Sequence, residues 1–271
     1  MGIGHRWNGD STLTEGTNDL LTLSELRERL VAVGHERYHH KHPFHLLMHS
    51  GKLTRGQLQA WALNRYYYQS QIPVKDAIIL SRTNDAEFRR NWRKRIVDHD
   101  GVDGQPGGIE NQPGGIEKWI RLAEATGLPA HRVTSTDEVL PGVRYAVDAY
   151  LQLVSQRSHL EAVASSLTEM FSRDLISLRV DALRVHYPWL ESGLAYFTAR
   201  LTQAPEDAAF AFDWVVKHAR TRPEQELAIA ALRDKCAILW AQLDALYYSY
   251  VNPGWAPPGA FQPGAFKMES V

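Results

Sequence analysis

Cysteine is nearly absent from this chain. The one cysteine, Cys236, rules out a disulfide within the chain and is typical of a reducing compartment such as the cytoplasm. The chain has no run of about 18 apolar residues, the length that spans a bilayer, and its first residues, MGIGHRWNGDSTLTEG, lack the apolar stretch of a signal peptide. Lysine and arginine together number 30 and acidic residues 31, so neither sign of charge is in excess. These absences predict a cytoplasmic globular protein that binds neither membranes nor nucleic acid.

The motifs that mark the commonest catalytic sites are missing too. No Cys-x-x-Cys or His-Glu-x-x-His supports a zinc site, and no Gly-x-Ser-x-Gly, P-loop or Rossmann fingerprint is present. A di-iron helical bundle needs two Glu-x-x-His elements and two further glutamates, whereas this chain has one, Glu36 to His39. Histidines crowd one stretch that Pro43 interrupts, at His39, His40, His42, His45 and His49. Capping, surface and active-site roles fit them better than metal ligation, so the sequence predicts no metal site.

Helical patterns fill the chain between residues 21 and 251. Capping boxes begin helices at Thr22 and Thr54, and Pro73 is expected to kink or restart the second of these helices. Further helices are expected at about 141–157, 159–184, 188–202, 205–220 and 223–250. No alternating pattern is long enough to predict a sheet. The sequence therefore predicts an all-α fold, a compact bundle of about seven helices in a single domain.

Three stretches depart from the helical pattern. Residues 1–20 are polar and are expected to form a disordered leader, and residues 252–271 form a Pro/Gly-rich tail or linker that resembles a connection to another domain. Between Asp98 and Lys118 the string QPGGIE occurs twice, at 105–110 and 112–117. The duplication is most simply an insertion that a loop tolerates, because loop length costs little free energy. A mobile lid is the alternative.

Charged and tyrosine side chains lie on the faces of these helices that should be apolar. Arg65 follows Leu58 at i+7, and Arg95 stands in the same relation to Phe88. One such cation usually extends its charged end to water, but several together indicate a polar interior. Buried cations need anions, and the acidic residues on these faces, chiefly Glu169, are too few. The sequence thus predicts an internal cationic pocket, lined by tyrosines, for a polycarboxylated aromatic small molecule.

Several long strings resemble one family. They are HPFHLLMHSG (42–51), NRYYYQSQIPVKDA (64–77), RIVDHDG (95–101), LPGVRYAVDAYL (140–151), SSLTEMF (165–171), HYPWL (186–190) and LDALYYSY (243–250). On these strings the chain resembles the pyrroloquinoline-quinone (PQQ) synthase family over roughly residues 24–250. The resemblance implies a heme-oxygenase-like helical bundle that acts as a homodimer without metal or organic cofactor. Members close a ring in a tricarboxylated quinoline precursor and oxidise it with O2, which yields PQQ and H2O2.

The resemblance also implies roles for particular residues. His99 would be the general base, and Tyr196 and Arg200 would lie beside the oxygen site, where a cation stabilises developing negative charge. Arg179 would act with them and bind a carboxylate. The remaining residues expected to bind or orient the substrate are Tyr38, His39, Arg65, Tyr68, Gln69, Lys75, Arg95, Tyr150, Thr168, Glu169 and Lys235.

The chain departs from the family pattern at Ile176, because the family commonly has a histidine, associated with oxygen handling, three residues before the arginine that matches Arg179. The duplicated QPGGIE is a second departure. A PQQ carrier without activity, a thiaminase-like hydrolase and a di-iron enzyme remain alternatives, although Cys236 is expected to be a small core residue rather than a nucleophile. The tail suggests a fused domain or a partner, such as a small peptide-binding protein of the same pathway.

Overall fold

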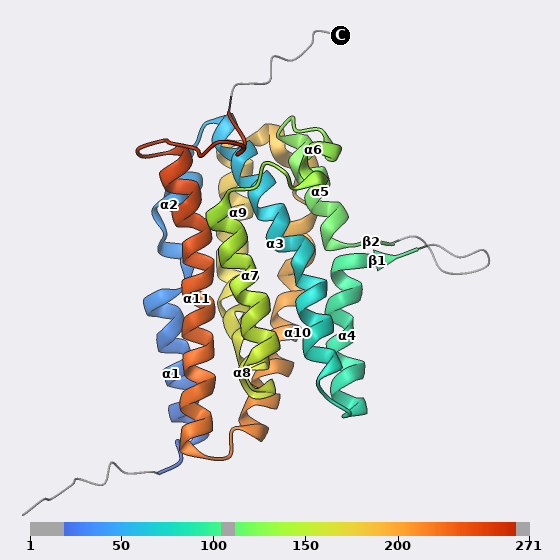
Figure 1. Cartoon of the computed structure of the whole chain (residues 1–271), viewed down its shortest axis with the longest axis vertical. Helices are drawn as coiled ribbons and strands as arrows, with labels where there is room; N and C mark the ends of the chain where they lie inside the picture. Colours follow the sequence, from blue (N-terminus) through green and yellow to red (C-terminus); the bar gives the residue numbers. More distant parts are fainter. Residues whose placement is uncertain (1–18, 104–111, 264–271) are drawn as a thin grey trace, which may run out of the picture.

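Helices make up most of the molecule. The computed structural model describes residues 19–103 and 112–263 (Figure 1). Within these two ranges lie eleven α-helices, three short 3₁₀ helices and one pair of two-residue strands. The predicted all-α fold is confirmed, with more helices than the seven expected. No helix in these ranges is both long and apolar enough to cross a membrane.

The α-helices differ widely in length, from six to 29 residues. The α-helices are α1 (Leu23–Arg37), α2 (Pro43–His49), α3 (Arg55–Ser81), α4 (Ala86–Asp100), α5 (Gly115–Ala125), α6 (Ala130–Ser135), α7 (Pro141–Gln156), α8 (His159–Ala164), α9 (Ser172–His186), α10 (Ala195–His218) and α11 (Arg222–Tyr250). The 3₁₀ helices are η1 (His39–Lys41), η2 (Ser165–Phe171) and η3 (Pro188–Gly193). The strands β1 (Gly101–Val102) and β2 (Gln112–Pro113) pair antiparallel.

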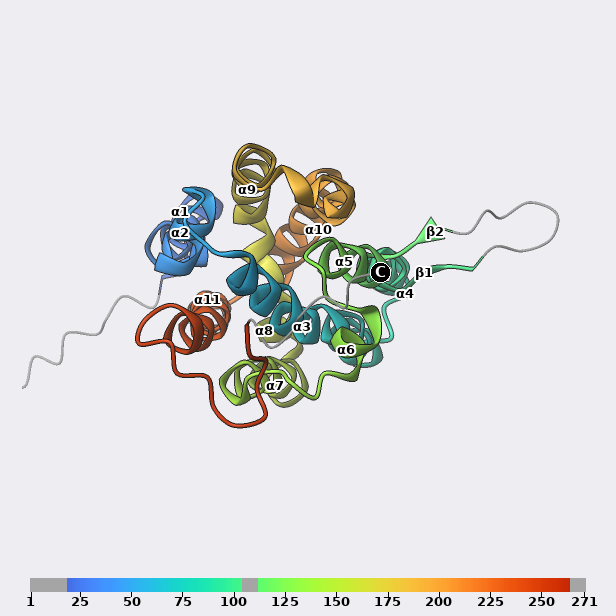
Figure 2. The same cartoon turned by 90° about the horizontal axis from the view of Figure 1, so that it is seen from above.

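The long helices surround α3, which packs against α4, α5 and α7. Viewed from above, α9 and α10 lie on one side of the bundle and α7 on the other (Figure 2). The last helix, α11, packs against α1, α7, α8 and η2. Apolar side chains gather in two buried clusters, one around Trp61, Trp119 and Phe197 and one around Trp92 and Leu232. The cavity described below borders both clusters.

The predicted helix starts are confirmed. Thr22 and Thr54 each form a complete capping box with the residue three positions later. Asp85 caps α4 by accepting hydrogen bonds from the backbone amides of Glu87 and Phe88. These signals are local, so the sequence alone was enough to place them.

The predicted helix breaks are partly wrong. The helix α3 does not restart at Pro73, which was one of the two outcomes expected there, and α10 continues through Pro205, where two helices were expected. Each proline removes only one backbone hydrogen bond, and packing along the long helices on either side outweighs that loss. Conversely, the helix expected over 159–184 is divided by η2. The strand pair was not predicted, because two residues are too few to show an alternating pattern.

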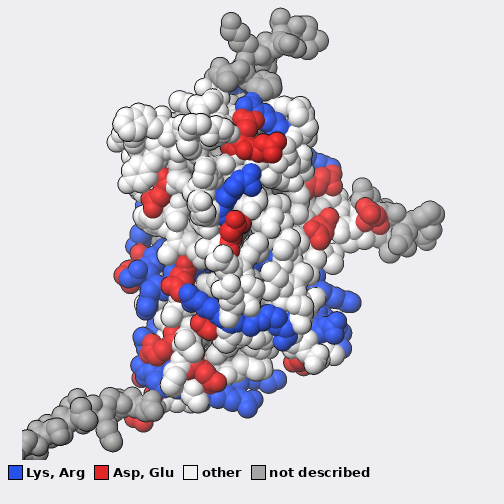
Figure 3. Space-filling view, viewed as in Figure 1, with Lys and Arg blue, Asp and Glu red and all other residues white. Residues whose placement is uncertain are grey.

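The first part of the expected linker packs against the helical domain. Phe261 is 2% exposed, and its backbone amide donates to the carbonyl oxygen of Glu138 at 3.0 Å. The Arg132 guanidinium lies 4.9 Å from the centre of its ring. Residues 252–263 therefore belong to the end of the bundle. All but the last two residues of the expected leader, the first QPGGIE copy and the rest of the tail lie within 1–18, 104–111 and 264–271, outside the described residues (grey in Figure 3).

Candidate active site

An internal cavity lies between α3, α9 and α10, with η2 at one side. Eleven of the residues expected at the site line this cavity: Tyr38, His39, Arg65, Tyr68, Gln69, His99, Thr168, Glu169, Arg179, Tyr196 and Arg200. Apolar residues complete the wall, among them Trp119, Leu175, Phe197 and Leu239. Residues far apart in the sequence thus meet at the place that the charge pattern predicted.

Four expected residues, namely Lys75, Arg95, Tyr150 and Lys235, do not line the cavity. Each instead contacts a neighbour. Lys235 donates to the Tyr68 hydroxyl at 2.9 Å, and the ring of Tyr150 stacks on Tyr68 with centroids 6.4 Å apart. Arg95 donates to Glu169, whereas Lys75 donates to Asp76, which was not among the expected site residues. These residues form the layer behind the cavity wall.

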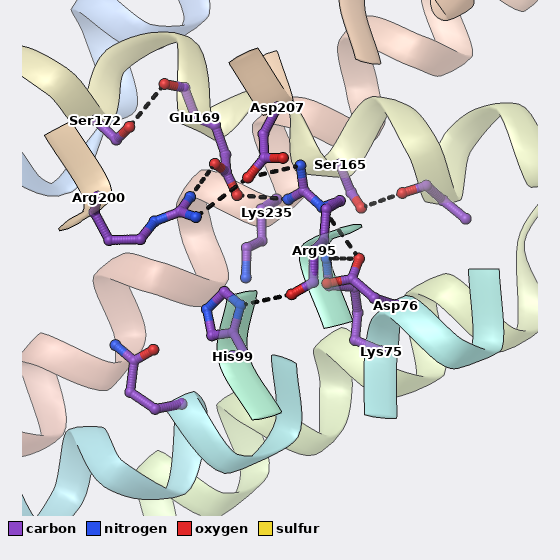
Figure 4. A network of polar contacts seen from close by, with 12 residues as sticks. Lys75, Asp76, Arg95, His99, Ser165, Glu169, Ser172, Arg200, Asp207 and Lys235 are labelled. Atoms are coloured by element: carbon purple, nitrogen blue, oxygen red, sulfur yellow. Dashed lines mark hydrogen bonds and ion pairs between the residues drawn. The ribbon is translucent and has the colours of Figure 1, made fainter. Parts of the chain in front are cut away.

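A network of ion pairs holds this layer together (Figure 4). Glu169, on η2, accepts hydrogen bonds from Arg95 at 2.5 Å and from Arg200. Asp207 lies 3.2 Å from Arg200 and 3.5 Å from Arg95. Burial opposes the charged form of Glu169, but the guanidinium groups of Arg200 and Arg95 lower its pKa to about 2. Glu169 is therefore an anion at neutral pH and fixes both arginines.

Asp76 extends the network away from the cavity. This fully buried carboxylate accepts from Lys75 at 2.5 Å and lies 3.4 Å from Nε of Arg95. Neither Asp76 nor Asp207 was among the expected site residues. A signal existed for both, since each stands seven residues after an expected site residue and so shares its helix face, Asp76 after Gln69 and Asp207 after Arg200.

Three further cations, the buried Arg179 and Lys235 and the partly buried Arg65, have no carboxylate partner among the described residues. Arg65 donates to the amide oxygen of Gln242 at 3.1 Å and lies 3.9 Å from the ring centre of Tyr68. Arg179 contacts His45, and Lys235 contacts Tyr68. The expectation that acidic residues are too few is thus correct for these three cations and wrong for Arg95 and Arg200.

The pKa values of these cations show the cost of the missing anions. Burial, Arg65 and Lys75 lower the pKa of Lys235 well below its ordinary value. Burial and Arg65 lower the pKa of Arg179 to about 10. In the ion-pair network, three cations face three carboxylates, whereas Arg65, Arg179 and Lys235 pair with no carboxylate of the described residues. A bound polyanion would stabilise the charged forms of these three side chains.

His99 stands at the end of α4 with one ring nitrogen fixed. Its Nδ1 lies 2.9 Å from the carbonyl oxygen of Arg95. A carbonyl only accepts, so Nδ1 carries the hydrogen and Nε2 keeps its lone pair. Burial and the positive charge of Arg200 lower the pKa of His99 to about 4, so the imidazole is neutral at pH 7. Figure 4 shows Nε2 directed away from the carbonyl. The group is arranged to accept a proton.

Tyr196 and Ile176 complete the wall. The Tyr196 hydroxyl donates to the side-chain oxygen of Gln69 at 2.9 Å, and its ring meets Trp119 edge-on. Ile176 lines the cavity, so the position where the family commonly has histidine is apolar here. Thr168 lies on η2 beside Glu169, because the 3₁₀ segment turns both side chains inward.

Two alternatives gain no support from the described residues. Cys236 is a fully buried core residue, as expected, and burial raises the pKa of its thiol to about 12. A thiaminase-like nucleophile needs an accessible thiolate, so Cys236 does not suit that role. Within 19–103 and 112–263, no three His, Cys, Asp or Glu side chains are placed to hold a metal ion.

Comparisons with known proteins agree with this architecture. A solved domain from Shewanella denitrificans with a heme oxygenase-like fold superposes with a TM-score of 0.70 at 12% identity, over 90% of this chain and all of that one. A TenA homolog from Pseudomonas syringae superposes with a TM-score of 0.67 at 14% identity, over 86% of this chain and 98% of that one. The chain is thus an all-α protein with a heme oxygenase-like fold.

Sequence relatives narrow the assignment. The chain belongs to the TENA/THI-4/PQQC family, whose sequence profile matches residues 27–245. It is 56% identical to a pyrroloquinoline-quinone synthase of Granulibacter bethesdensis, over 93% of this chain and 96% of that protein. It is 54% identical to a bifunctional coenzyme PQQ synthesis protein C/D of Methylorubrum extorquens, over 90% of this chain and 64% of that protein. The family resemblance inferred from the motifs is confirmed.

Proposed function

We propose that this protein catalyses the final step of PQQ biosynthesis. The reaction closes a ring in a tricarboxylated hexahydroquinoline-dione and oxidises it with O2 to PQQ, releasing H2O2. The observation that carries the proposal is the match of charge: Arg65, Arg179 and Lys235 have no carboxylate partner among the described residues and lie in or directly behind the wall of a tyrosine-lined cavity, and the substrate carries three carboxylates. The names of its relatives support a role in the same pathway.

The chain's own residues suggest how the reaction proceeds. Neutral His99 accepts protons through Nε2 from the substrate ring. Arg65 and Arg179, which line the cavity, hold carboxylates, and Lys235 supports them from behind Tyr68. Each transfer of two electrons from the ring to O2 generates negative charge on oxygen, which Arg200 stabilises before two protons complete H2O2. No metal or organic cofactor is part of this proposal, and O2 is the co-substrate.

Substrate binding prepares His99 for this role. The positive field of Arg200 disfavours the imidazolium form in the free protein. A bound trianion opposes that field, so the pKa of His99 rises toward its ordinary value when the substrate is present. An imidazole that gains basicity on binding suits repeated proton transfer at neutral pH.

The cellular setting is part of the same proposal. We place the enzyme in the cytoplasm as a homodimer, as the family resemblance implies. The bifunctional relative joins two activities of PQQ synthesis in one chain, with this chain matching 64% of its length. A peptide-binding protein of the same pathway is therefore the partner that we propose.

The test is turnover by metal-stripped protein. The ring-open tricarboxylate is incubated without oxygen, O2 is then admitted, and absorbance, oxygen uptake and peroxide are recorded. We expect oxygen-dependent formation of PQQ, reduced at least 100-fold in His99→Ala, the usual scale for a lost general base. His131→Ala is the matched control, because His131 is exposed on α6.

The rival functions give different results in this experiment. Tight binding of PQQ with no oxygen uptake indicates a carrier, and Ile176→His then tests whether the apolar position is the reason. Activity that returns only after iron is added indicates a di-iron enzyme. Either result contradicts the proposal.

A further inference from the structure

Two histidines and an arginine form a hydrogen-bonded chain at one side of the cavity. Nδ1 of His45, on α2, lies 3.0 Å from the carbonyl oxygen of His39 and 3.3 Å from Nδ1 of the His39 ring. Nε2 of His45 lies 3.1 Å from Nη2 of Arg179. His45 and His39 are 2% and 5% exposed, so bulk water does not compete for the hydrogen bonds of their rings.

Both nitrogens of His45 have a determined role. The carbonyl of His39 only accepts, so Nδ1 of His45 carries the hydrogen. Nη2 of Arg179 lies 3.1 Å from Nε2 of His45 and 3.4 Å from its Nδ1. A guanidinium only donates and Nδ1 already carries the hydrogen, so Nε2 supplies the lone pair. A neutral imidazole has one N–H and one acceptor nitrogen, and these two contacts require that same arrangement. Burial and the charge of Arg179 lower the pKa of His45 well below its ordinary value, which keeps the ring neutral.

The position of the ring hydrogen on His45 determines which ring nitrogen of His39 carries its hydrogen. Since Nδ1 of His45 carries a hydrogen, Nδ1 of His39 at 3.3 Å must be an acceptor, or two N–H groups would face each other. Burial and Arg65 lower the pKa of His39 well below its ordinary value, so this ring is neutral as well. Its hydrogen is then on Nε2. No hydrogen bond among the described residues occupies that nitrogen, and His39 lines the cavity.

We propose that His45, held by Arg179, is a positioning residue that keeps His39 in the Nε2–H form, so that His39 donates a hydrogen bond to a ligand oxygen in the cavity. The ligand part of this proposal rests on the proposed function, because carboxylate and quinone oxygens only accept. Arg179 therefore has two roles. Its guanidinium lines the cavity, and through His45 it determines which nitrogen of His39 carries the hydrogen.

The first test needs no ligand. In ligand-free protein labelled with ¹⁵N-histidine, long-range proton–nitrogen correlations distinguish the two neutral forms of each ring. We expect hydrogen on Nδ1 of His45 and on Nε2 of His39, with peaks assigned from His39→Gln and His45→Gln. Hydrogen on Nδ1 of His39 in the unaltered protein would overturn the proposal, whether or not the protein binds PQQ.

The second test separates the two nitrogens of His45. Asparagine places an amide nitrogen near the position of Nδ1, and glutamine places its amide near the position of Nε2. His45→Asn therefore preserves the donor to His39, whereas His45→Gln removes it. We expect His45→Gln to mix the two forms of His39 and to weaken PQQ binding about tenfold, the usual effect of one lost hydrogen bond, and His45→Asn to do neither.

His49→Asn is the control, because the His49 ring stacks on His45 with centroids 5.8 Å apart and has no hydrogen bond to it. Equal loss of affinity in His45→Asn and His45→Gln, or an unchanged His39 in His45→Gln, contradicts the proposal. Failure of the unaltered protein to bind PQQ contradicts the proposed function instead, and leaves the ligand-free result to decide the role of His45.

Discussion

Some side chains at this site are expected to lower the stability of the free protein and to strengthen ligand binding. Lys235 is the clearest case. Its side chain is fully buried, and its ammonium contacts the Tyr68 hydroxyl and the face of the Tyr150 ring, 3.1 Å from the ring centre. Neither contact supplies a negative charge. A buried charge without a partner destabilises a protein, and the ligand that we propose would account for its retention here.

Lys235→Met tests this trade. Methionine fills a similar volume without a charge, so we expect the ligand-free protein to gain about 1 to 3 kcal/mol of unfolding free energy. We expect the same variant to bind PQQ at least tenfold more weakly. Urea unfolding and a PQQ titration measure the two effects, with Lys217→Met, at an exposed position, as control. A loss of stability with unchanged binding would contradict the account.

Cations on otherwise apolar helix faces were predicted to lie inside the bundle. This prediction is correct for Arg65, Arg179 and Lys235. It could not show which cations find partners, because ion pairs depend on distances between helices. Asp76 and Asp207 were missed for that reason: each pairs with a residue on another helix, as Asp207 does with Arg95. The partner of each cation could therefore be assigned only from the three-dimensional structure.

Among the elements, η2 decides where Glu169 and Thr168 point. Gly34 on α1 makes room for it, since a methyl group at Gly34 would overlap the ring of Phe171, the last residue of η2. Local patterns favoured one helix over 159–184, but η2 interrupts it. This segment packs against α10 and α11, and Phe171 packs against Gly34 of α1, and the sequence alone could not reveal these contacts.

Gly34→Ala should displace η2. Alanine favours helix by about 1 kcal/mol over glycine, but overpacking against Phe171 costs about 1 to 3 kcal/mol, so we expect a net loss of stability. PQQ affinity should fall as well, because Glu169 moves with η2. Adding Phe171→Leu should relieve most of both effects in a double-mutant cycle. Additive losses would show that Gly34 and Phe171 do not act together.

The second copy of QPGGIE, at 112–117, packs close to the site. It forms β2 and the start of α5, and a methyl group at Gly114 would overlap the backbone of His99 and Gly101. A methyl group at Gly115 would lie 3.3 Å from the ring of His99 and 3.4 Å from that of Tyr196. The sequence showed the repeat but not which copy supports the site.

Deleting residues 105–111, which removes the first copy, should leave stability and PQQ affinity within about twofold, because loop length costs little. Gly114→Ala should reduce activity at least tenfold by moving His99. Far-UV circular dichroism confirms that both variants fold, and turnover compares them. A deletion as damaging as Gly114→Ala would assign the first copy a role at the site.

At the scale of the whole molecule, buried neutral histidines make stability depend on pH. Burial lowers the pKa of His39, His45, His49 and His99, the last to about 4. Between pH 6.5 and 4 these histidines are protonated in the unfolded chain, whereas in the folded protein they remain neutral. Stability is therefore full above pH 6.5 and falls as the pH drops toward 4, by about 3 kcal/mol for His99 alone.

Three carboxyls oppose this trend. Burial raises the pKa of Asp207 to about 6, and it also raises the pKa of Asp98 and of Asp100, so protonation of these groups favours the folded state. The histidines outnumber them, and we expect a net loss of unfolding free energy between pH 6.5 and 4.5. Urea unfolding at several pH values measures the slope, and His99→Gln should make it shallower. Stability that stays level or rises would contradict the burial of these rings as neutral groups.

The whole account depends on three uncompensated cations meeting three carboxylates. Calorimetric titration of PQQ and of its trimethyl ester into the same protein tests this most directly, because the ester keeps the ring and removes the negative charges. We predict one PQQ per chain and at least 100-fold weaker binding of the ester. Equal affinity for the two compounds would show that the cavity recognises the ring alone, and would contradict the account.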